Sequence, residues 1–386
     1  MVAPIAIIGG GPSGLTLARL LEVKGIDYVV YERDDAEPSV PQGGSLDLHP
    51  DSGQLALKQA GLFDEFLKHA RYDATVFNIL DKNGTSLLKI GDGRDAPEID
   101  RPMLRKILLE SIPKEKILWG HGVKSVDRDQ EGKVVVTFQN GKTETGFKLL
   151  VGADGAWSKT RHLLTPVQPI YSGKMYIETS VTPTNPFHGT LKERIGPGSL
   201  MAVAPKQNVL AMCQGDGSYK VYASVSVAAD FAKTELDIHN KPDEARQLLV
   251  ERFFGDWSND LTEMILKADG KIREWPLYYL PPDELPWKQV SGVTLLGDAA
   301  HLTTPFVGEG VNCAMTDAMR LAEEIGKHGV DGLDEAVKAY EEDMIPRGVD
   351  LIQRSQGAGE LFYGAGSPGS VVDVFSGGGG GDDGTW

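Results

Sequence analysis

Three glycines near the N-terminus have the spacing of a phosphate-binding turn. Gly9, Gly11 and Gly14 follow an apolar run, and an acidic residue, Glu32, comes eighteen positions after Gly14. Between a strand and a helix, such glycines let backbone N–H groups approach a pyrophosphate, and the acidic side chain accepts hydrogen bonds from ribose hydroxyls. The N-terminus of the following helix also favours negative charge. The pattern predicts a bound dinucleotide whose adenosine has free hydroxyls, which favours FAD or NAD over NADP.

A second chemically informative stretch lies late in the chain. Gly297 and Asp298 end an apolar run, and residues 305–312 read Pro-Phe-Val-Gly-Glu-Gly-Val-Asn before a helical pattern. Asp298 suits the hydroxyls of a ribityl or ribose group. Backbone donors at the start of the helix suit the negative charge that develops on a reduced flavin. In a flavoenzyme, this stretch would lie against the redox-active ring.

The elements that must position these residues alternate between strands and helices. Residues 4–32 have the pattern of a strand–helix–strand unit, and Asn83-Gly84 predicts the turn of a hairpin over 74–90. Further strands are predicted over 123–127, 133–138, 143–147, 148–153 and 293–296, with several alternating segments between 174 and 279, and helices over 101–111, 243–254, 308–325 and 333–355. The pattern predicts an α/β fold.

The order of these elements predicts a discontinuous first domain. The apolar run at 293–296 is typical of a buried parallel strand, so it is expected to complete the sheet that begins at the N-terminus. The predicted division is 1–172 with 281–330 for the dinucleotide-binding domain, 173–280 for a mixed-sheet substrate domain, 331–366 for a C-terminal bridging helix and 367–386 for a flexible glycine-rich tail.

Composition narrows the class of partner. The 386 residues carry 39 Lys and Arg against 55 Asp and Glu, a formal net charge of −16. Because a nucleic-acid partner would need a basic face, this charge argues against one. No apolar stretch approaches the ~18 residues of a membrane-spanning helix, and the N-terminal residues show no secretory signal. Cys213 and Cys313 predict neither a disulfide framework nor a metal cluster, and His301 is expected to satisfy backbone groups. We therefore expect a cytoplasmic monomer with no membrane partner and no metal.

Three motifs in order resemble those of the class A flavoprotein monooxygenases. They are Gly9-x-Gly11-x-x-Gly14, the segment from Gly152 through Asp154-Gly155 to Arg161, and Gly297-Asp298. Over residues 5–361 the chain looks most similar to the tetracycline-inactivating monooxygenases, through the segments 43–49, 97–105 and 297–302. The resemblance implies a Rossmann-like FAD-binding domain of the para-hydroxybenzoate hydroxylase type, a mixed-sheet substrate domain and a bridging C-terminal helix.

The resemblance also implies an activity. FAD would be bound, NADPH or NADH would reduce it transiently, and a flavin C4a-hydroperoxide formed with O2 would hydroxylate or oxidatively inactivate a small molecule. That molecule would be a polycyclic aromatic or polyketide-like compound, with tetracyclines among the candidates. Because the flavin carries the chemistry, no side chain is expected to act as a catalytic nucleophile or base.

The implied site residues fall into two groups. The cofactor contacts are Gly9, Gly11, Pro12, Ser13, Gly14, Glu32, Arg33, Asp47, Arg101, Arg105, Asp154, Gly297, Asp298, Pro305, Gly308, Gly310, Val311 and Asn312. The substrate contacts are Glu178, Tyr222, Phe306, Val307 and Gly308. Arg101 and Arg105 lie four apart on one predicted helix face, a spacing typical of a solvated pair, and the resemblance is what assigns them to the cofactor.

Two other interpretations stay open. A flavin oxidase or halogenase has the same fold, although the Trp-x-Trp-x-Ile-Pro segment of halogenases is missing where Glu274-Trp275-Pro276-Leu277 comes closest to it. A protein that binds a flavin or a drug without turnover would have a similar sequence, because binding and catalysis use the same cofactor site.

Overall fold

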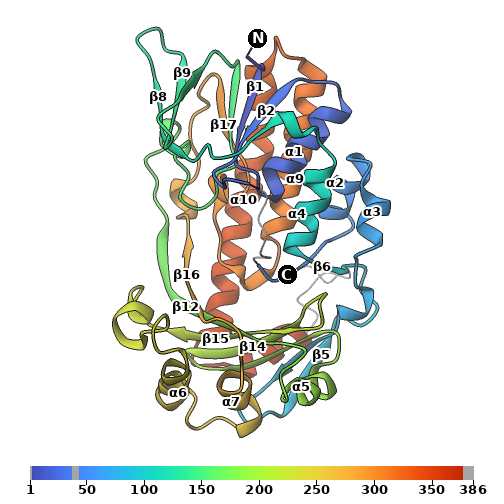
Figure 1. Ribbon diagram of the computed structural model, residues 1–386, viewed down its shortest axis with the longest axis vertical. Helices are drawn as coiled ribbons and strands as arrows, with labels where there is room; N and C mark the ends of the chain where they lie inside the picture. Colours follow the sequence, from blue (N-terminus) through green and yellow to red (C-terminus); the bar gives the residue numbers. More distant parts are fainter. Residues whose placement is uncertain (1, 37–42, 377–386) are drawn as a thin grey trace.

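The computed structural model describes residues 2–36 and 43–376. Figure 1 shows two sheets at opposite ends of an elongated molecule, joined by the long strands β12 and β16 and by helix α10. Within the described residues, no helix is both long and apolar enough to cross a membrane. The predicted flexible tail begins at 367, but residues 369–376 form a helix, and the remainder from 377 lies outside the described residues.

The first sheet is parallel and has the order β17-β11-β1-β2-β7. Its strands are β1 (Ile5–Ile8), β2 (Tyr28–Tyr31), β7 (Ile117–Leu118), β11 (Leu149–Gly152) and β17 (Val293–Leu295). These short apolar strands are almost entirely buried, as expected for a parallel sheet covered on both faces. Because β17 pairs with β11, a late segment of the chain completes the sheet that begins at the N-terminus.

A group of helices shares one apolar core with a face of the parallel sheet. They are α1 (Pro12–Val23), α2 (Gly53–Gln59), α3 (Phe63–Leu67), α4 (Arg101–Glu110), α8 (Asp298–His301), α9 (Gly310–His328) and the first part of α10 (Leu333–Tyr363). The fixed φ of Pro12 suits the first turn of α1. Gly25, with φ +66°, ends the same helix in a conformation that glycine adopts readily.

The opposite face of the parallel sheet is covered by a three-stranded antiparallel meander, formed by three of the predicted strands. It consists of β8 (Val123–Arg128), β9 (Val134–Phe138) and β10 (Thr143–Thr145). Val126, Val136 and Phe138 are fully buried against the sheet residues Ala6 and Ile8. This alternation of buried and exposed residues is typical of an antiparallel sheet with one solvated face.

The second sheet has seven strands in the order β16-β12-β15-β14-β13-β4-β5. They are β4 (Phe77–Leu80), β5 (Ser86–Ile90), β12 (Ile170–Val181), β13 (Ser199–Ala204), β14 (Gln207–Cys213), β15 (Tyr219–Ser226) and β16 (Arg273–Tyr279). The helices of this part of the chain are α5 (His188–Ile195), α6 (Pro242–Phe253) and α7 (Asn259–Leu266). One sheet face and these helices share an apolar core.

The hairpin of β4 and β5 differs from the predicted division. The two strands pair as expected from Asn83-Gly84, but β4 also pairs in parallel with β13, so the hairpin belongs to the seven-stranded sheet. The division had placed residues 74–90 with the first domain. The turn residues predict a hairpin. They do not predict which sheet the hairpin joins, because that depends on contacts with strands more than a hundred residues away.

The long helix α10 connects the two ends of the molecule. The predicted helix ended at 355, but α10 continues to Tyr363, and its last turns pack against β13 and β14. Its earlier part packs against α9 and α8. The helix α11 (Gly369–Ser376) follows it and packs against the same end through Val371 and Phe375.

Candidate functional site

Three turns meet at the carboxyl edge of the parallel sheet. In the strand register, Ile8 of β1 lies beside Gly152 of β11, and Gly152 lies beside Leu295 of β17. The turns that follow these residues carry the three motifs identified in the sequence. Ligands of open α/β sheets bind at this edge, outside the carboxyl ends of the strands. The topology therefore brings the three motifs to one ligand-binding position.

The glycine turn is tightly packed at two positions and open at a third. A Cβ atom on Gly9 would lie closer than 3.0 Å to the carbonyl oxygen of Ala153, and one on Gly14 would lie equally close to the carbonyl oxygen of Gly9. At Gly11, no described atom lies within 4 Å of the Cβ position. This open space is at the N-terminus of α1, beside Pro12 and Ser13, where backbone N–H groups and the helix dipole favour a phosphate.

The Glu32 carboxylate is bound to the same turn. Its Oε2 atom accepts a hydrogen bond from the N–H of Gly10 at 2.5 Å, and its Oε1 atom accepts one from the N–H of Asp34 at 3.1 Å. A carboxylate has about four lone-pair sites, so Glu32 can still accept from a ribose hydroxyl. Arg105 of α4 donates to the carbonyl oxygen of Gly10 at 2.8 Å. Its side chain is 18% exposed, so the solvated position suggested by its spacing to Arg101 is wrong.

The other two predicted arginines lie at the margin of this region. The side chain of Arg33 is 84% exposed and its Nε atom lies 4.0 Å from the carboxylate of Asp34. Arg101 is exposed at the start of α4, and its Cδ atom lies 2.8 Å from the Cβ position of Gly43. Both guanidinium groups can reach solvent, so a bound anion would have access to them.

Arg161 joins the second motif to the third. Asp154 accepts hydrogen bonds from the hydroxyl of Ser158 at 2.6 Å and from the N–H of Lys159 at 2.7 Å, which fixes its turn. The buried guanidinium of Arg161 donates to the carbonyl oxygens of Ala299 at 2.8 Å and Asp298 at 3.1 Å. The side chain of Asp298 is exposed, so its carboxylate is available to a ligand.

Asp317 of α9 fixes the third turn from inside the protein. Its Oδ2 atom accepts a hydrogen bond from the N–H of Gly297 at 2.8 Å and lies 2.6 Å from Nε2 of His301. Its Oδ1 atom accepts from Arg347 of α10 at 2.9 Å. Gly297 has φ +59°, a conformation that favours glycine. One fully buried carboxylate therefore ties the turn to two helices, and the expectation that His301 satisfies backbone groups is wrong because its partner is Asp317.

These buried groups form an ion-pair network. Burial disfavours the ionised form of Asp317, but His301 and Arg347 outweigh it and hold the pKa of Asp317 below its ordinary value. Burial also disfavours protonation of His301, yet contacts with Cys313 and Asp317 raise the pKa of His301 well above its ordinary value. His301, Cys313 and Asp317 bring metal-ligand atoms within 4.8 Å of one another. A metal ion there would have to displace donors that Asp317 already holds.

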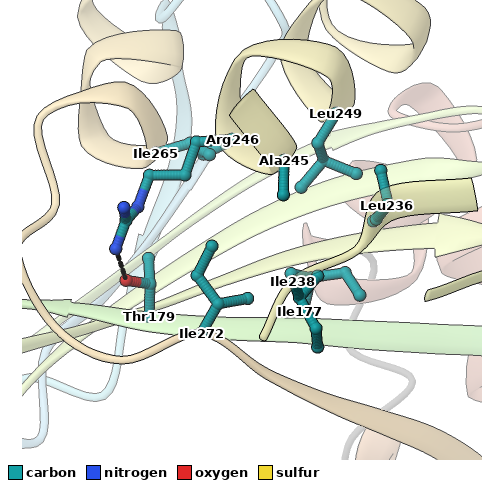
Figure 2. A pocket seen from close by; sticks show the side chains of 9 residues that line it. All are labelled: Ile177, Thr179, Leu236, Ile238, Ala245, Arg246, Leu249, Ile265 and Ile272. Carbon is teal, nitrogen blue, oxygen red and sulfur yellow. Dashed lines mark hydrogen bonds between the residues drawn. The ribbon is translucent and has the colours of Figure 1, made fainter. Parts of the chain in front are cut away.

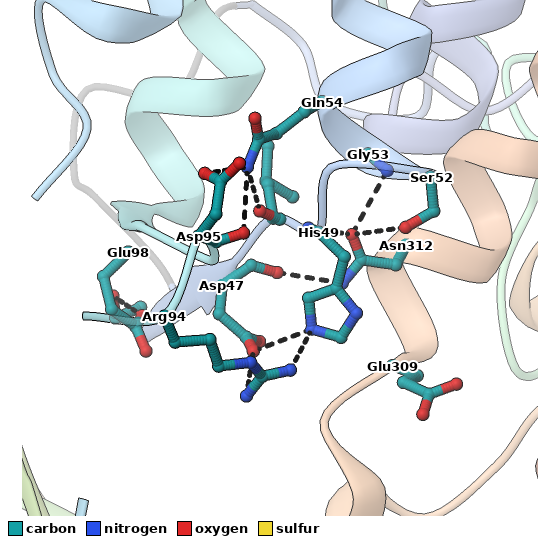
Figure 3. Close-up of polar contacts among 12 residues, drawn as sticks. Asp47, His49, Ser52, Gly53, Gln54, Arg94, Asp95, Glu98, Glu309 and Asn312 are labelled. Atoms are coloured by element: carbon teal, nitrogen blue, oxygen red, sulfur yellow. Dashed lines mark hydrogen bonds and ion pairs between the residues drawn. The ribbon is translucent and has the colours of Figure 1, made fainter. Parts of the chain in front are cut away.

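Asn312 connects the start of α9 to the loop after β3 (Ser45–Asp47) (Figure 3). Its Oδ1 atom accepts from the N–H of His49 at 2.9 Å and of Gly53 at 3.3 Å, and its Nδ2 atom donates to the carbonyl oxygen of Asp47 at 2.9 Å. The side chain is 2% exposed. A contact between this residue and the cofactor would therefore use its backbone rather than its amide group.

Asp47 adjoins both this loop and the third motif. Its carboxylate lies 3.0 Å from Nε2 of His49 and 3.8 Å from the guanidinium of Arg94 (Figure 3). The Cβ position of Gly308, the residue with φ +73° after η6 (Pro305–Val307), lies 3.8 Å from Oδ1 of Asp47. Gly310, which begins α9, has open space at its Cβ position, as Gly11 does. Asp47, Gly308 and Gly310 are thus neighbours around open space at a helix N-terminus, and Val311 follows in the same turn.

Glu98 is the cross-strand partner of Asp47 in the two-stranded sheet of β3 and β6 (Glu98–Asp100). Burial, followed by the nearby Asp47 carboxylate, raises the pKa of Glu98 to about 7, although the hydroxyl of Ser45 donates to it. Arg71 forms an ion pair with Asp100 at 2.6 Å, and Asp100 also accepts from the N–H of Gly215. This cluster joins the β3–β6 region to the turn between β14 and β15.

The predicted substrate contacts gather on one face of the seven-stranded sheet. In β12, Tyr176 and Glu178 alternate with Ile177, which faces α6. Tyr222 of β15 is the cross-strand partner of Glu178, and its ring centroid lies 5.6 Å from that of Tyr176. The ring of Phe306, next to Val307 in η6, lies 6.4 Å from that of Tyr176. The structure therefore brings Glu178, Tyr222 and Phe306 together around Tyr176.

This face is turned toward the cofactor-side loops. The hydroxyl of Tyr222 lies 3.0 Å from the Cβ position of Gly44, the residue before β3, and Phe306 belongs to the loop of the third motif. The opposite face holds a cavity of about 10 Å³ beside α6, where Arg246 donates to Thr179 (Figure 2). That volume is room for about one water molecule, so an aromatic substrate would not fit there.

Several side chains at this face were missed from the sequence. The hydroxyl of Tyr363, at the end of α10, is hydrogen-bonded to Ser224, and its ring lies 5.5 Å from that of Phe306. Glu178 is held by Lys220 and Trp275. The alternation of β12 and β15 gives the faces of Tyr176 and Lys220, but the partners from β16 and α10 depend on tertiary packing. Arg161 was present in the second motif without a predicted role.

Comparison with known proteins decides the family. The model of the FAD binding domain family matches residues 2–355. The chain belongs to this family. It is 33% identical to the monooxygenase penA of Penicillium thymicola, over 89% of this chain and 91% of penA. The expected class is thereby confirmed: the protein is an FAD-dependent monooxygenase.

Solved structures of flavoproteins share its fold. HpxO of Klebsiella pneumoniae, in complex with FAD and uric acid, has a TM-score of 0.78 and 22% identity, covering 96% of this chain and 91% of HpxO. The tetracycline destructase Tet(51) has a TM-score of 0.69 and 19% identity, covering 98% of this chain and 95% of Tet(51). The expected fold, an FAD-binding domain of the para-hydroxybenzoate hydroxylase type with a mixed-sheet domain, is confirmed.

The geometry of the monooxygenase fits FAD. The open space at Gly11 suits the pyrophosphate, Glu32 lies where a ribose can bind, and the exposed carboxylate of Asp298 lies on the turn between them and α9. The open N-terminus of α9 at Gly310 suits the electron-rich edge of the flavin ring. The contacts of individual residues with FAD remain predictions, and these positions give them a common location.

Proposed function

We propose that this FAD monooxygenase uses NADPH or NADH and O2 to hydroxylate, or to inactivate by oxidation, a polycyclic aromatic or polyketide-like small molecule. Tetracycline-type compounds are among the candidates. The observation that carries the proposal is the cluster of Tyr176, Tyr222, Phe306 and Tyr363, which faces the cofactor-side loops. Flat aromatic side chains with a few polar groups are typical of sites that bind ring systems.

The chain's own residues would bind, orient and exclude water. FAD, when bound, supplies the redox chemistry that activates O2. Asp298 would hold hydroxyls of the cofactor, and the backbone N–H groups at the start of α9 would stabilise negative charge near the ring. Tyr176 and Phe306 would lie against the faces or edges of the substrate ring and keep water out.

The first experiment is an absorbance spectrum of the purified protein, followed by coenzyme oxidation in the same cuvette. We expect flavin absorbance, and NADPH or NADH oxidation that a phenolic or tetracycline-like compound stimulates. Mass spectrometry should then find a product that has gained one oxygen atom. A flavin-containing protein that binds such compounds but consumes no coenzyme would contradict the proposal and favour a sequestering protein. Oxygen uptake that requires halide would favour a halogenase.

A substitution separates the cofactor assignment from the substrate assignment. Asp298→Ala should lower the FAD content and the rate together, because the exposed carboxylate is expected to contact the cofactor. The matched control is Asp331→Asn, which changes an exposed carboxylate paired with Lys148 away from the site. If Asp298→Ala keeps full FAD content and full turnover, the role given to the third motif is wrong.

A further inference from the structure

A charged pair lies within the aromatic face of the seven-stranded sheet. Oε1 of Glu178 accepts a hydrogen bond from Nζ of Lys220 at 2.8 Å, and Oε2 accepts one from the indole N–H of Trp275 at 2.8 Å. The strand register places all three side chains on the face of Tyr176 and Tyr222, because Glu178 pairs with Tyr222, and Trp275 pairs with Tyr176. The side chains of Glu178 and Lys220 are 10% and 16% exposed, so both are mostly withdrawn from water yet still accessible.

Both charged groups keep unused hydrogen-bonding capacity. An ammonium group has three donors and a carboxylate has about four lone-pair sites. Among the described residues, Lys220 donates one hydrogen bond and each oxygen of Glu178 accepts one. Two donors of Lys220 and about two acceptor sites of Glu178 therefore remain, on side chains of adjacent strands whose nitrogen and oxygen lie 2.8 Å apart. Trp275 holds the second carboxylate oxygen, which limits rotation of the group.

Stability alone does not account for such a pair. A largely buried ion pair is often no more stabilising than apolar residues of similar size, since both charges lose hydration. The aromatic rings of Tyr176 and Tyr222 adjoin the pair on this face, and an apolar pair would continue them. The ion pair of Glu178 and Lys220 is therefore a polar group beside aromatic rings that suit a flat substrate.

We propose that Glu178 and Lys220 together recognise an N–H group next to a carbonyl group on the substrate. The N–H would donate to Glu178 and the carbonyl oxygen would accept from Lys220, while the attached ring lies against Tyr176 and Tyr222. In a cis amide the nitrogen and oxygen lie about 2.3 Å apart, a separation compatible with two parallel hydrogen bonds to groups 2.8 Å apart. The substrate class is a lactam, cyclic imide, ureide or hydroxypyridine tautomer. The inference rests on the proposed function, because it names the substrate of the same site.

The test compares two probes that differ only in the ring nitrogen. 2,6-Dihydroxypyridine, in its lactam tautomer, offers an N–H beside a carbonyl, whereas resorcinol has the same two oxygens and a C–H instead. Dissociation constants are measured by calorimetry on the FAD-loaded protein, with no coenzyme present. We expect 2,6-dihydroxypyridine to bind at least about tenfold more tightly than resorcinol, since resorcinol has no ring N–H that could donate to Glu178 while the adjacent oxygen accepts from Lys220.

Two variants assign the preference to the pair. Glu178→Gln and Lys220→Met should each reduce the difference between the probes to less than about threefold, mainly by weakening 2,6-dihydroxypyridine and not resorcinol. The control is Glu244→Gln, at an exposed pair with Lys241 on α6, away from this sheet face. It should keep the wild-type preference. FAD content confirms that each variant is folded.

The outcomes separate this inference from the proposed function. Equal affinities of the wild-type protein for the two probes, or no binding of 2,6-dihydroxypyridine at millimolar concentration, would overturn the inference. Equal weakening of both probes in Glu178→Gln would also overturn it, because that result indicates a structural role. The proposed function fails separately, if no panel compound stimulates coenzyme oxidation, and the probe preference can be measured whether or not turnover occurs.

Discussion

Replacing Asp317 by Asn removes one charge from the buried network without changing the shape of the side chain. An Asn can still accept from the N–H of Gly297, but it cannot balance the charges of Arg347 and His301. Asp317 is fully buried, and Arg347 is its hydrogen-bond partner on α10. The substitution therefore takes from His301 and Arg347 the buried carboxylate that balances their charges.

The expected loss of stability is large for a single atom exchange. Removing one partner of a buried ion pair costs about 3–5 kcal/mol, against a total stability of roughly 5–15 kcal/mol for a typical protein. Arg347 also pairs with exposed Asp343, which lowers the expected loss toward the smaller figure. FAD affinity should fall as well, because the turn that carries Asp298 loses its charged anchor.

The pH dependence follows from the two pKa shifts. The lowered pKa of Asp317 gives a stabilising contribution that is present above its ordinary value of 3.8 and lost as pH falls through the folded value. The raised pKa of His301 gives a contribution that is present below its ordinary value of 6.5 and lost as pH rises through the folded value. The difference between wild type and Asp317→Asn should therefore be largest between these two ordinary values.

Urea unfolding followed by intrinsic fluorescence measures this difference, and flavin fluorescence measures the cofactor affinity. Asp331→Asn serves as the control, since Asp331 is exposed and pairs only with Lys148 among the described residues. It should leave the unfolding midpoint unchanged. If Asp317→Asn unfolds at the wild-type midpoint across the pH range, the network does not anchor the turn and the reasoning is refuted.

Two further predictions concern the cofactor side of the site. Gly14→Ala should destabilise the fold, because its Cβ would press on the carbonyl oxygen of Gly9. Gly11→Ala should keep the urea midpoint and lose FAD, because its Cβ would fill the open phosphate position. Similar effects of the two variants on the urea midpoint would contradict this prediction. Glu98, with its pKa raised to about 7 from 4.5, keeps its proton in that range while the unfolded chain loses it, so stability should fall as pH rises through the range. Glu98→Gln should abolish that fall in urea midpoints, and an unchanged pH profile would show that Glu98 does not titrate there.

The sequence predicts the cofactor turns well because each is a local pattern. A strand, a glycine turn and a helix are contiguous at Gly9 to Gly14, and parallel strands bring their carboxyl ends to one edge whatever lies between them. Arg105 shows the limit of local reasoning. Its spacing to Arg101 is that of a surface pair, but the acceptor that decides its position is the carbonyl oxygen of Gly10, ninety-five residues away.

The substrate side is less predictable for the same reason. Glu178 and Tyr222 fall on one face by alternation, but the sequence does not show that Lys220 and Trp275 hold the carboxylate. The hairpin of β4 and β5 was predicted from its turn, yet its sheet was not, because the parallel pairing with β13 joins segments far apart in the chain. The role of Asp317 was missed because acidic residues in a predicted helix usually lie on its solvated face.

The helix α10 contacts both the cofactor side and the substrate side of the site. Its Gly348 lies so close to His301 that an added Cβ would stand 2.7 Å from the Cβ of that residue, and a Cβ on its Gly359 would stand 2.9 Å from the ring of Phe306. Arg347 of the same helix binds Asp317, and Tyr363 at its end binds Ser224 of the sheet. One continuous helix thus contacts the anchor of the cofactor turn, the loop after that turn and the aromatic face. Because one helix of 31 residues makes all of these contacts, we expect a change in its packing to alter both the cofactor side and the substrate side of the site.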